Sequence, residues 1–154
     1  MKRLGYVRTS TNKQYTDRQV NKLKKCCDKV YIEDGVSARS KARPVLNQIL
    51  ADLDAGDEFV VTAYDRAFRS VIEGLTTLDD LTERDITPVS LSQQVDPTTP
   101  DGRLYLTIIL GMGEWEVNVL AQRTIEGLKA AVRRGKTLGR PRKKLLKPLM
   151  ATGG

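Results

Sequence analysis

Apolar positions follow two different rhythms along the first hundred residues. Short runs rich in β-branched and aromatic side chains favour strands, and they lie at residues 4–8, 30–32, 59–63 and 86–91. Between these runs, apolar residues recur at helical spacing. Because strands that alternate with helices form parallel sheets, the pattern predicts an α/β fold with a mainly parallel central sheet of about four or five strands, flanked by helices.

Three helices are expected between these strands. The first begins near Thr16, and its apolar face consists of Val20, Leu23 and Cys27. The second opens at Pro44, because proline suits a first helical turn, and ends near Gly56. The third is expected to be capped by Ser70. Its inward side chains are predicted to be Ile72, Leu75, Leu78 and Leu81.

The pattern changes after a polar loop at residues 93–100. Residues 101–134 contain no proline and predict one helix that is much longer than usual. Its first part, LYLTIILGMG, is apolar on nearly every side and must be covered on every side. We expect a second copy of the chain to cover the side that the sheet leaves open. The alternative is a core helix wrapped by its own domain.

These patterns divide the chain into three parts. Residues 1–100 are predicted to form an α/β core, residues 101–134 an oligomerisation helix, and residues 135–154 a basic arm and tail. The glycines and the proline of GKTLGRPRKK cannot extend a helix, so the arm is expected to be extended. The few residues that follow the arm are too few for a helix-turn-helix domain, and none is expected here.

The net charge of +7 is unevenly distributed. Residues 123–154 hold ten Lys and Arg residues against one acid, whereas residues 1–122 hold sixteen against eighteen. Such an asymmetry predicts contact with nucleic acid or another anionic surface, and the alternative is a solvated tail without a partner. The candidate DNA-binding residues are Arg133, Arg134, Lys136, Arg140, Arg142, Lys143 and Lys144.

Other classes of protein fit the composition poorly. No apolar run approaches membrane-spanning length and the N-terminus lacks the apolar region of a signal peptide, so a cytoplasmic protein without a membrane partner is expected. The adjacent Cys26 and Cys27 are interpreted as free thiols. With no histidine and no dense carboxylate motif, neither a metal site nor a cofactor is predicted.

Several chemically useful side chains follow the predicted strands. Ser10 comes just after the first strand, and Asp65 and Arg66 follow the third. The carboxyl ends of parallel strands lie at one edge of the sheet, where ligands bind, so these segments are expected to meet. Ser10 is a candidate nucleophile although the chain has no histidine to serve as its base. The alternative is an ordinary turn residue.

Four arginines are expected near that edge, namely Arg8, Arg43, Arg66 and Arg69. Guanidinium groups bind phosphate oxygens through paired hydrogen bonds, and several aimed at one point would repel each other unless they shared an anion. A shared phosphate would resolve that conflict, and the arginines would stabilise a phosphoryl-transfer transition state. Asp65 could orient an arginine or carry a proton. Alternatively, each arginine is a surface residue with its own acidic partner.

Taken together, these residues resemble the catalytic domain of the serine recombinases, the resolvase/invertase family. The similarity extends over residues 3–142. The matching segments are GYVRTST with Gln14 and Gln19 after it, Arg43-Pro44, YDRAFRS, DGRLYLTIILGMGEWE, QRTIEGL and GRP. The chain differs from the family pattern at Ala67, Phe68, Val117 and Gln122.

The resemblance implies a site-specific DNA recombinase. Such an enzyme cleaves and rejoins DNA through a 5′-phosphoserine link, here at Ser10, without metal or ATP. Arg8, Arg43, Arg66 and Arg69 would hold the phosphate, and Asp65 would transfer a proton at the leaving oxygen. Supporting positions in the active site would be Tyr6, Gln14, Gln19 and Arg123.

The resemblance also implies partners. These are double-stranded DNA at a crossover site, a second subunit in a homodimer, a tetramer at synapsis, and in some systems an accessory DNA-bending protein. A cytoplasmic, nucleoid-associated protein is therefore expected. Two other functions are compatible with parts of the sequence: a non-enzymatic DNA-associated or multimerisation protein on the same scaffold, and a small phosphate-ester hydrolase. The hydrolase does not explain the long apolar helix or the basic arm.

Overall fold

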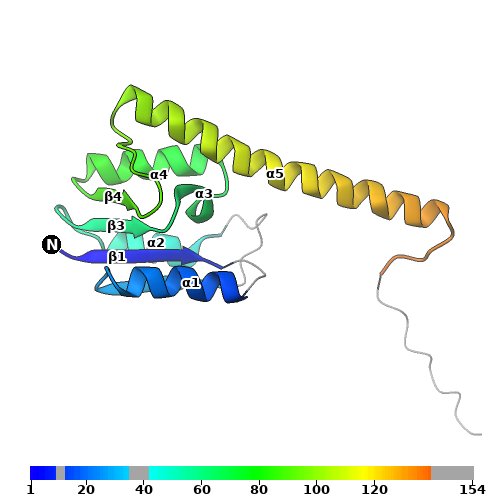
Figure 1. Ribbon diagram of the computed structural model, residues 1–154, viewed down its shortest axis with the longest axis horizontal. Coiled ribbons are helices and arrows are strands. Elements are labelled where there is room, and N and C mark those ends of the chain that lie inside the picture. The colour runs from blue at the N-terminus through cyan, green and yellow to red at the C-terminus, as the bar shows by residue number, and fades with distance from the viewer. Residues whose placement is uncertain (10–12, 35–41, 140–154) are drawn as a thin grey trace, which may run out of the picture. The chain divides into compact units, whose positions relative to one another are not determined.

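Four parallel strands form one sheet at the centre of the part of the chain that the structure describes (Figure 1). The structure is a computed structural model that describes residues 1–9, 13–34 and 42–139, with the backbone alone at residues 13–15. The strands are β1 (Arg3–Arg8), β2 (Lys29–Glu33), β3 (Glu58–Val61) and β4 (Thr87–Ser90). Their order in the sheet is β2-β1-β3-β4. The prediction of an α/β fold with a mainly parallel sheet is therefore confirmed.

Helices connect and follow the strands. They are α1 (Lys13–Lys24), α2 (Pro44–Asp52), α3 (Tyr64–Ala67), α4 (Val71–Glu83) and α5 (Pro100–Arg133). The chain forms two compact units, Met1–Val117 and Asn118–Gly154. The first unit reaches Val117, well beyond residue 100, because Leu106 and Leu110 of α5 are buried in its core.

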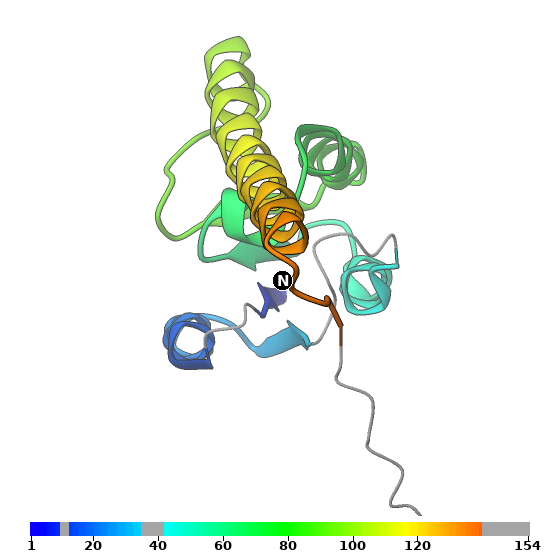
Figure 2. The same ribbon diagram turned by 90° about the vertical axis from the view of Figure 1, so that its right-hand side faces the viewer.

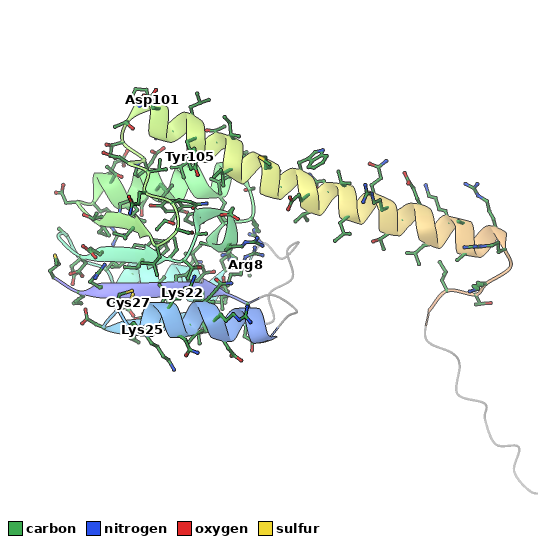
Figure 3. The ribbon with its side chains drawn as sticks, viewed as in Figure 1. Arg8, Lys22, Lys25, Cys27, Asp101 and Tyr105 are labelled. Carbon is green, nitrogen blue, oxygen red and sulfur yellow. The ribbon has the colours of Figure 1, made fainter. Side chains whose placement is uncertain are left out.

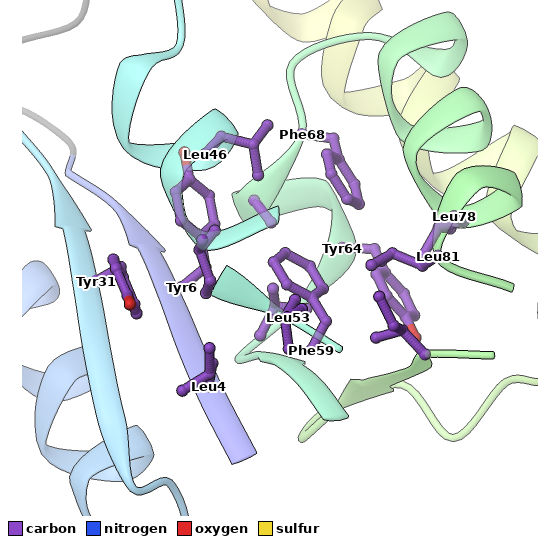
Figure 4. Close-up of a cluster of buried hydrophobic side chains, with 14 of the residues drawn as sticks. Leu4, Tyr6, Tyr31, Leu46, Leu53, Phe59, Tyr64, Phe68, Leu78 and Leu81 are labelled. Carbon is purple, nitrogen blue, oxygen red and sulfur yellow. The ribbon is translucent and has the colours of Figure 1, made fainter. Parts of the chain in front are cut away.

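The sheet has two unequal faces, as the side-chain alternation of a strand requires. On one face, Val7 and Val60 pack with Val20 and Leu23 of α1. The other face carries the larger cluster, in which Tyr6 and the rings around it stack at centroid separations of 6.1–6.5 Å (Figure 4). Helices α2 and α4 cover that face, and α1 lies on the opposite side of the sheet (Figures 1 and 2).

Several predicted boundaries were wrong. Helix α1 begins at Lys13 instead of Thr16, and α2 ends at Asp52 instead of near Gly56. Gly56 has a φ of 86° and lies in the turn before β3, where the left-handed conformation favours glycine. The short helix α3 was not predicted at all, because four residues carry no readable periodicity.

The third predicted helix was largely correct. Ser70 caps α4 by accepting a hydrogen bond from the Glu73 backbone N–H at 3.1 Å, as predicted. Leu78 and Leu81 are buried, but Ile72 is 80% exposed instead of facing inward. The buried positions of α4 are spaced four and three residues apart and begin at Gly74, so Ile72 lies off that face.

Helix α5 is 34 residues long and exposes much of its apolar surface within the described chain. Its buried positions in the first unit are Gly102, Leu106 and Leu110. Its large exposed apolar side chains there are Leu104, Tyr105, Ile108, Met112, Trp115 and Val117. The helix is long and apolar enough to cross a membrane by length and composition, with an 18-residue window of mean hydropathy 1.2. The expectation that no segment approaches that length was therefore wrong.

The start of α5 is packed closely against the loop before it. A Cβ atom at Gly102 would lie 1.8 Å from the Asp96 carbonyl oxygen, which is backbone and cannot rotate away. Gly102→Ala is therefore expected to lower the free energy of unfolding by about 1–3 kcal/mol or more, measured by denaturant unfolding. At Gly113 a Cβ would meet nothing within 4 Å. Gly113→Ala should raise stability by about 0.5–1 kcal/mol, and equal effects of the two changes would contradict the prediction.

Candidate active site

Arg8, Asp65, Arg66 and Arg69 line one cavity of about 140 Å³. Arg8 is the last residue of β1, and Asp65 and Arg66 lie on α3, directly after β3. Figure 3 shows Arg8 at the end of its strand, beside α3. The wall is completed by Phe68 and by residues of α5 up to Val117. The two segments that were expected to meet at the carboxyl edge of the sheet do meet there.

Two hydrogen bonds of Thr9 hold the chain just after β1. The Thr9 backbone N–H donates to the Glu33 carbonyl at 3.0 Å, and the Thr9 hydroxyl donates to Asp34 at 2.9 Å. These two bonds fix the end of β1 beside β2. Ser10, the predicted nucleophile, is the next residue and lies outside the described residues, so its role stays a prediction.

A glutamine that the sequence analysis did not identify holds Asp65 in place. The Gln93 Nε2 donates to Asp65 Oδ1 at 2.8 Å, and Gln93 Oε1 accepts from the Tyr64 backbone N–H, also at 2.8 Å. Arg66 Nε lies 3.3 Å from the other carboxylate oxygen of Asp65. Gln93 could have been found by the rule that pointed to Asp65, because it too follows a strand, β4, at the carboxyl edge.

Arg69 is held at the beginning of α4. Its backbone N–H donates to Glu73 Oε2 at 3.0 Å, and its Nε lies 3.3 Å from Glu73 Oε1. The N-terminus of α4 is also bonded to α5, since the Val71 backbone N–H donates to Glu114 Oε2 at 3.2 Å. Glu73 was not among the predicted site residues. Its place in the first turn after the Ser70 cap was the available signal.

Arg43 does not line this cavity. Its side chain is 4% exposed and all five of its N–H groups have acceptors inside the protein. Nε donates to Glu33 Oε2 at 2.6 Å, one terminal nitrogen donates to both Glu73 oxygens at 2.9 Å, and the other donates to Tyr6 Oη and to the Ala67 carbonyl. The prediction that Arg43 holds the phosphate stays untested, but in this structure its guanidinium is an internal group.

Burial and neighbouring charges shift the pKa values of the groups around Arg43. Burial alone would raise the pKa of Glu33, but hydrogen bonds from Tyr6 and Arg43 outweigh it and hold that pKa below its usual value. The pKa of Tyr6 is raised above its usual range, mainly by burial and by its bond to Glu33. The pKa of Arg8 is lowered, first by burial and then by the nearby charge of Arg43. Arg8 is therefore a cation held where its charge is disfavoured, which is common at functional sites.

The other predicted site residues lie in different places. Gln19 is buried, and its Oε1 accepts a hydrogen bond from the Thr62 hydroxyl at 2.9 Å, which ties α1 to the end of β3 and does not reach the cavity. The side chain of Gln14 lies outside the described part. Arg123 belongs to the second compact unit. Arg133, Arg134 and Lys136 are exposed, whereas Arg140, Arg142, Lys143 and Lys144 lie outside the described residues.

Metal binding finds no support in the described ranges 1–9, 13–34 and 42–139. They contain no group of three or more His, Cys, Asp or Glu side chains that could hold an ion. The two free cysteines are adjacent, with their sulfur atoms 3.8 Å apart. The cavity itself is lined by three arginines and by the carboxylates of Asp65, Glu114 and Glu116, and its guanidinium groups can bind an anionic group.

Comparison with known proteins supports one interpretation of this arrangement. The family model described as Resolvase, N terminal domain, matches residues 3–137. A probable DNA-invertase y4cG of Sinorhizobium fredii is 39% identical over 90% of this chain, and the chain spans 45% of that relative's length. The serine recombinase gin of Escherichia phage Mu is 38% identical over 91% of this chain and 72% of its own.

The solved structures agree with the sequence relatives. The N-terminal catalytic domain of TP901-1 integrase superposes with a TM-score of 0.54 and 27% identity, and the match covers 77% of this chain and 98% of that domain. A resolvase family site-specific recombinase from Streptococcus pneumoniae, 20% identical with a TM-score of 0.53, shares the fold. On the family model and these relatives together, the chain belongs to the resolvase/invertase family of serine recombinases and carries its N-terminal domain.

Proposed function

We propose that the protein is a site-specific DNA recombinase that cleaves and rejoins duplex DNA through a 5′-phosphoserine link at Ser10. The observation that carries the proposal is the cavity in which Arg8, Arg66 and Arg69 gather beside Asp65. Arg8 ends β1, and Ser10 follows it two residues later in the sequence. Three guanidinium groups around one small space suit a phosphodiester, whose charge increases in the transition state.

The proposed reaction balances without an external energy source. The Ser10 Oγ attacks the phosphorus, a serine–phosphate ester forms, and the bond to the 3′ oxygen breaks. The serine proton leaves to a base and the 3′ oxygen gains a proton, for which Asp65 is the proposed carrier. The reverse reaction with a new 3′-hydroxyl rejoins the strands. The arginines lower the cost of the added negative charge, so the nucleophile has less need of a histidine base.

Trapping the covalent intermediate tests this proposal. The protein is incubated with a pool of random-sequence duplexes and with genomic DNA, denatured, and the DNA that remains attached to protein is recovered and sequenced from its 5′ ends. We expect adducts at a small set of sites, and we expect Ser10→Ala to abolish them. Thr11→Ala removes a neighbouring hydroxyl and should leave adducts. A wild-type protein that yields no adduct, or adducts that persist in Ser10→Ala, would refute the assignment.

The apolar surface of α5 suits contact between subunits. Leu104, Tyr105, Ile108, Met112 and Trp115 are each at least 43% exposed within the first compact unit. A continuous exposed apolar surface of this kind marks an interaction site in proteins. We propose that it mediates a homodimer, and a tetramer when two DNA sites are joined. We propose that these assemblies act on cellular DNA and that the protein is associated with the nucleoid.

The basic arm is proposed to contact DNA phosphates, and salt titration tests this contact. Binding to duplex should weaken steeply as salt rises, because each neutralised phosphate releases counterions. Lys136→Ala should reduce the slope of log affinity against log salt by about 0.9. Lys24→Ala, which removes a lysine at the end of α1, should leave the slope unchanged. Equal slopes for Lys136→Ala and the wild type would exclude Lys136 as a phosphate contact.

A further inference from the structure

A continuous series of hydrogen bonds leads from the centre of the sheet to the active-site cavity. It begins at Tyr6 and Glu33, the hydroxyl of Tyr6 donating to Glu33 Oε2, and Arg43 donates to both. Arg43 next donates to Glu73, and Glu73 in turn accepts from Arg69. The family resemblance assigns no role to Glu33 or Glu73.

Arg43 and Glu73 do not line this cavity. They line a neighbouring cavity of about 370 Å³ together with Arg69, whereas Arg8, Asp65 and Arg66 line the first one. Arg69 lines both. A phosphate in the first cavity would therefore contact Arg69, which is also paired with Glu73.

Glu73 has the geometry of a bridge between the two arginines. One Arg43 nitrogen lies 2.9 Å from each of its oxygens, and its Oε2 also accepts from the Arg69 backbone N–H at 3.0 Å. The Arg69 Nε lies 3.3 Å from its Oε1. Its side chain is 18% exposed and begins in the capped first turn of α4, so its position is well fixed. Glu73 therefore contacts Arg69 at two points, its backbone N–H and its Nε.

We propose that Glu73 is a positioning residue that fixes the Arg69 guanidinium toward the scissile phosphate, and that Arg43 acts on catalysis through Glu73 instead of by touching the phosphate. Arg43 also supplies the positive charge that keeps Glu73 paired in a partly buried place. The inference rests on the proposed function for its consequence in cleavage. Its structural part, the hold of Glu73 on Arg69, can be measured without DNA.

The first measurement follows the arginine Nε–H groups in a proton–nitrogen correlation spectrum of the DNA-free protein. The Arg69 and Arg43 signals are assigned from their loss in Arg69→Lys and Arg43→Lys. Solvent exchange of the Arg69 Nε–H should quicken by about tenfold in Glu73→Gln, because Nε loses the negative charge with which it is paired. The control is Glu83→Gln, an exposed glutamate at the other end of α4, which should change neither signal.

The second measurement is a double-mutant cycle on the cleavage rate, with the duplexes recovered as adducts. Glu73→Gln should slow cleavage by about tenfold to a hundredfold, because a misplaced catalytic group loses rate steeply with small displacements. Glu73→Gln should add little to Arg69→Lys, since both act through the same guanidinium. Arg43→Lys should likewise add little to Glu73→Gln. Thermal unfolding of each variant confirms that it is folded.

Distinct outcomes separate this inference from the proposed function. If the wild type forms no adduct, the proposed function fails while the exchange measurement still tests the hold of Glu73 on Arg69. If the wild type cleaves and the rate losses of Glu73→Gln and Arg69→Lys multiply, Glu73 does not act through Arg69. Multiplying losses of Arg43→Lys and Glu73→Gln would show that Arg43 acts on the phosphate independently. Unchanged exchange of the Arg69 Nε–H in Glu73→Gln would overturn the inference directly.

Discussion

Arg43→Ala is expected to lower the free energy of unfolding by about 3–5 kcal/mol, because it removes one partner of a buried ion pair and leaves the others uncompensated. Glu33 would lose its 2.6 Å partner while its own side chain stays fully buried, and the Ala67 carbonyl would lose its donor. Chemical denaturation at neutral pH measures the change. The loss should be far larger than for Arg103→Ala, whose ion pair with Asp79 is about half exposed and contributes at most about 1 kcal/mol.

The pH dependence of this loss has a definite sign. In the wild type the pKa of Glu33 is lowered from 4.5, so its stabilisation is present above that value and is lost as pH falls through the lower folded pKa. Without Arg43, burial is the largest remaining influence and should raise the pKa of Glu33 above 4.5. The variant should then gain stability as Glu33 becomes protonated on acidification. The difference in the free energy of unfolding between the wild type and Arg43→Ala should therefore become smaller from pH 7 toward pH 4. A difference that becomes larger would contradict this account.

Arg8→Ala is expected to reduce the cleavage rate by about 100- to 1000-fold while leaving the free energy of unfolding unchanged or slightly raised. The loss of rate follows because one preorganised donor at the reacting phosphate contributes that much. The stability follows because burial and the charge of Arg43 disfavour the charge of Arg8. The Arg8 side chain donates one hydrogen bond within the described chain, from Nε to the Arg66 carbonyl at 3.2 Å.

Arg3 is the matched control for Arg8, since it lies at the other end of the same strand. Its Nε pairs with Glu58, away from the cavity, so Arg3→Ala should cost a little stability and no cleavage. Single-turnover cleavage at saturating DNA, together with denaturant unfolding, separates the two effects. An Arg8→Ala protein that cleaves at the wild-type rate would remove Arg8 from the active site. If Arg8→Ala lost activity only because the protein unfolded, the result would likewise contradict a catalytic role for Arg8.

Local patterning explains what the sequence predicted well. The alternation of apolar runs with helical faces is a backbone property, so the parallel sheet, the Ser70 cap and the length of α5 were all predictable. The boundaries of α1 and α2 were less predictable, because a helix end depends on a few competing hydrogen bonds. The prediction that Ile72 faces inward was wrong because the apolar residues of α4 fit either of two neighbouring helix faces.

Some residues of the candidate site could be predicted from the sequence and others could not. Arg8 ends β1, and the other three predicted residues that line the cavity follow β3. The rule that parallel strands end at one edge of the sheet was enough to bring them together. Arg43 follows no strand and opens a helix, so that rule does not say which way its side chain turns. Glu33 carries no signal in the sequence that names its partner. Gln93 and Glu73 had positional signals, after β4 and in the capped first turn of α4, but those signals do not say which groups they bind.

By itself, the sequence determined the α/β fold and the side chains that gather at the carboxyl edge, because these follow from local periodicity and from the order of strands. The family followed from the resemblance of its motifs. Only the tertiary structure decided which arginine faces the cavity and which is an internal group. That choice depends on where the carboxylates of Glu33 and Glu73 lie in space, 10 and 30 residues from Arg43 along the chain. Electrostatic pairing at close range in a buried place is decided by the folded geometry, which no local pattern encodes.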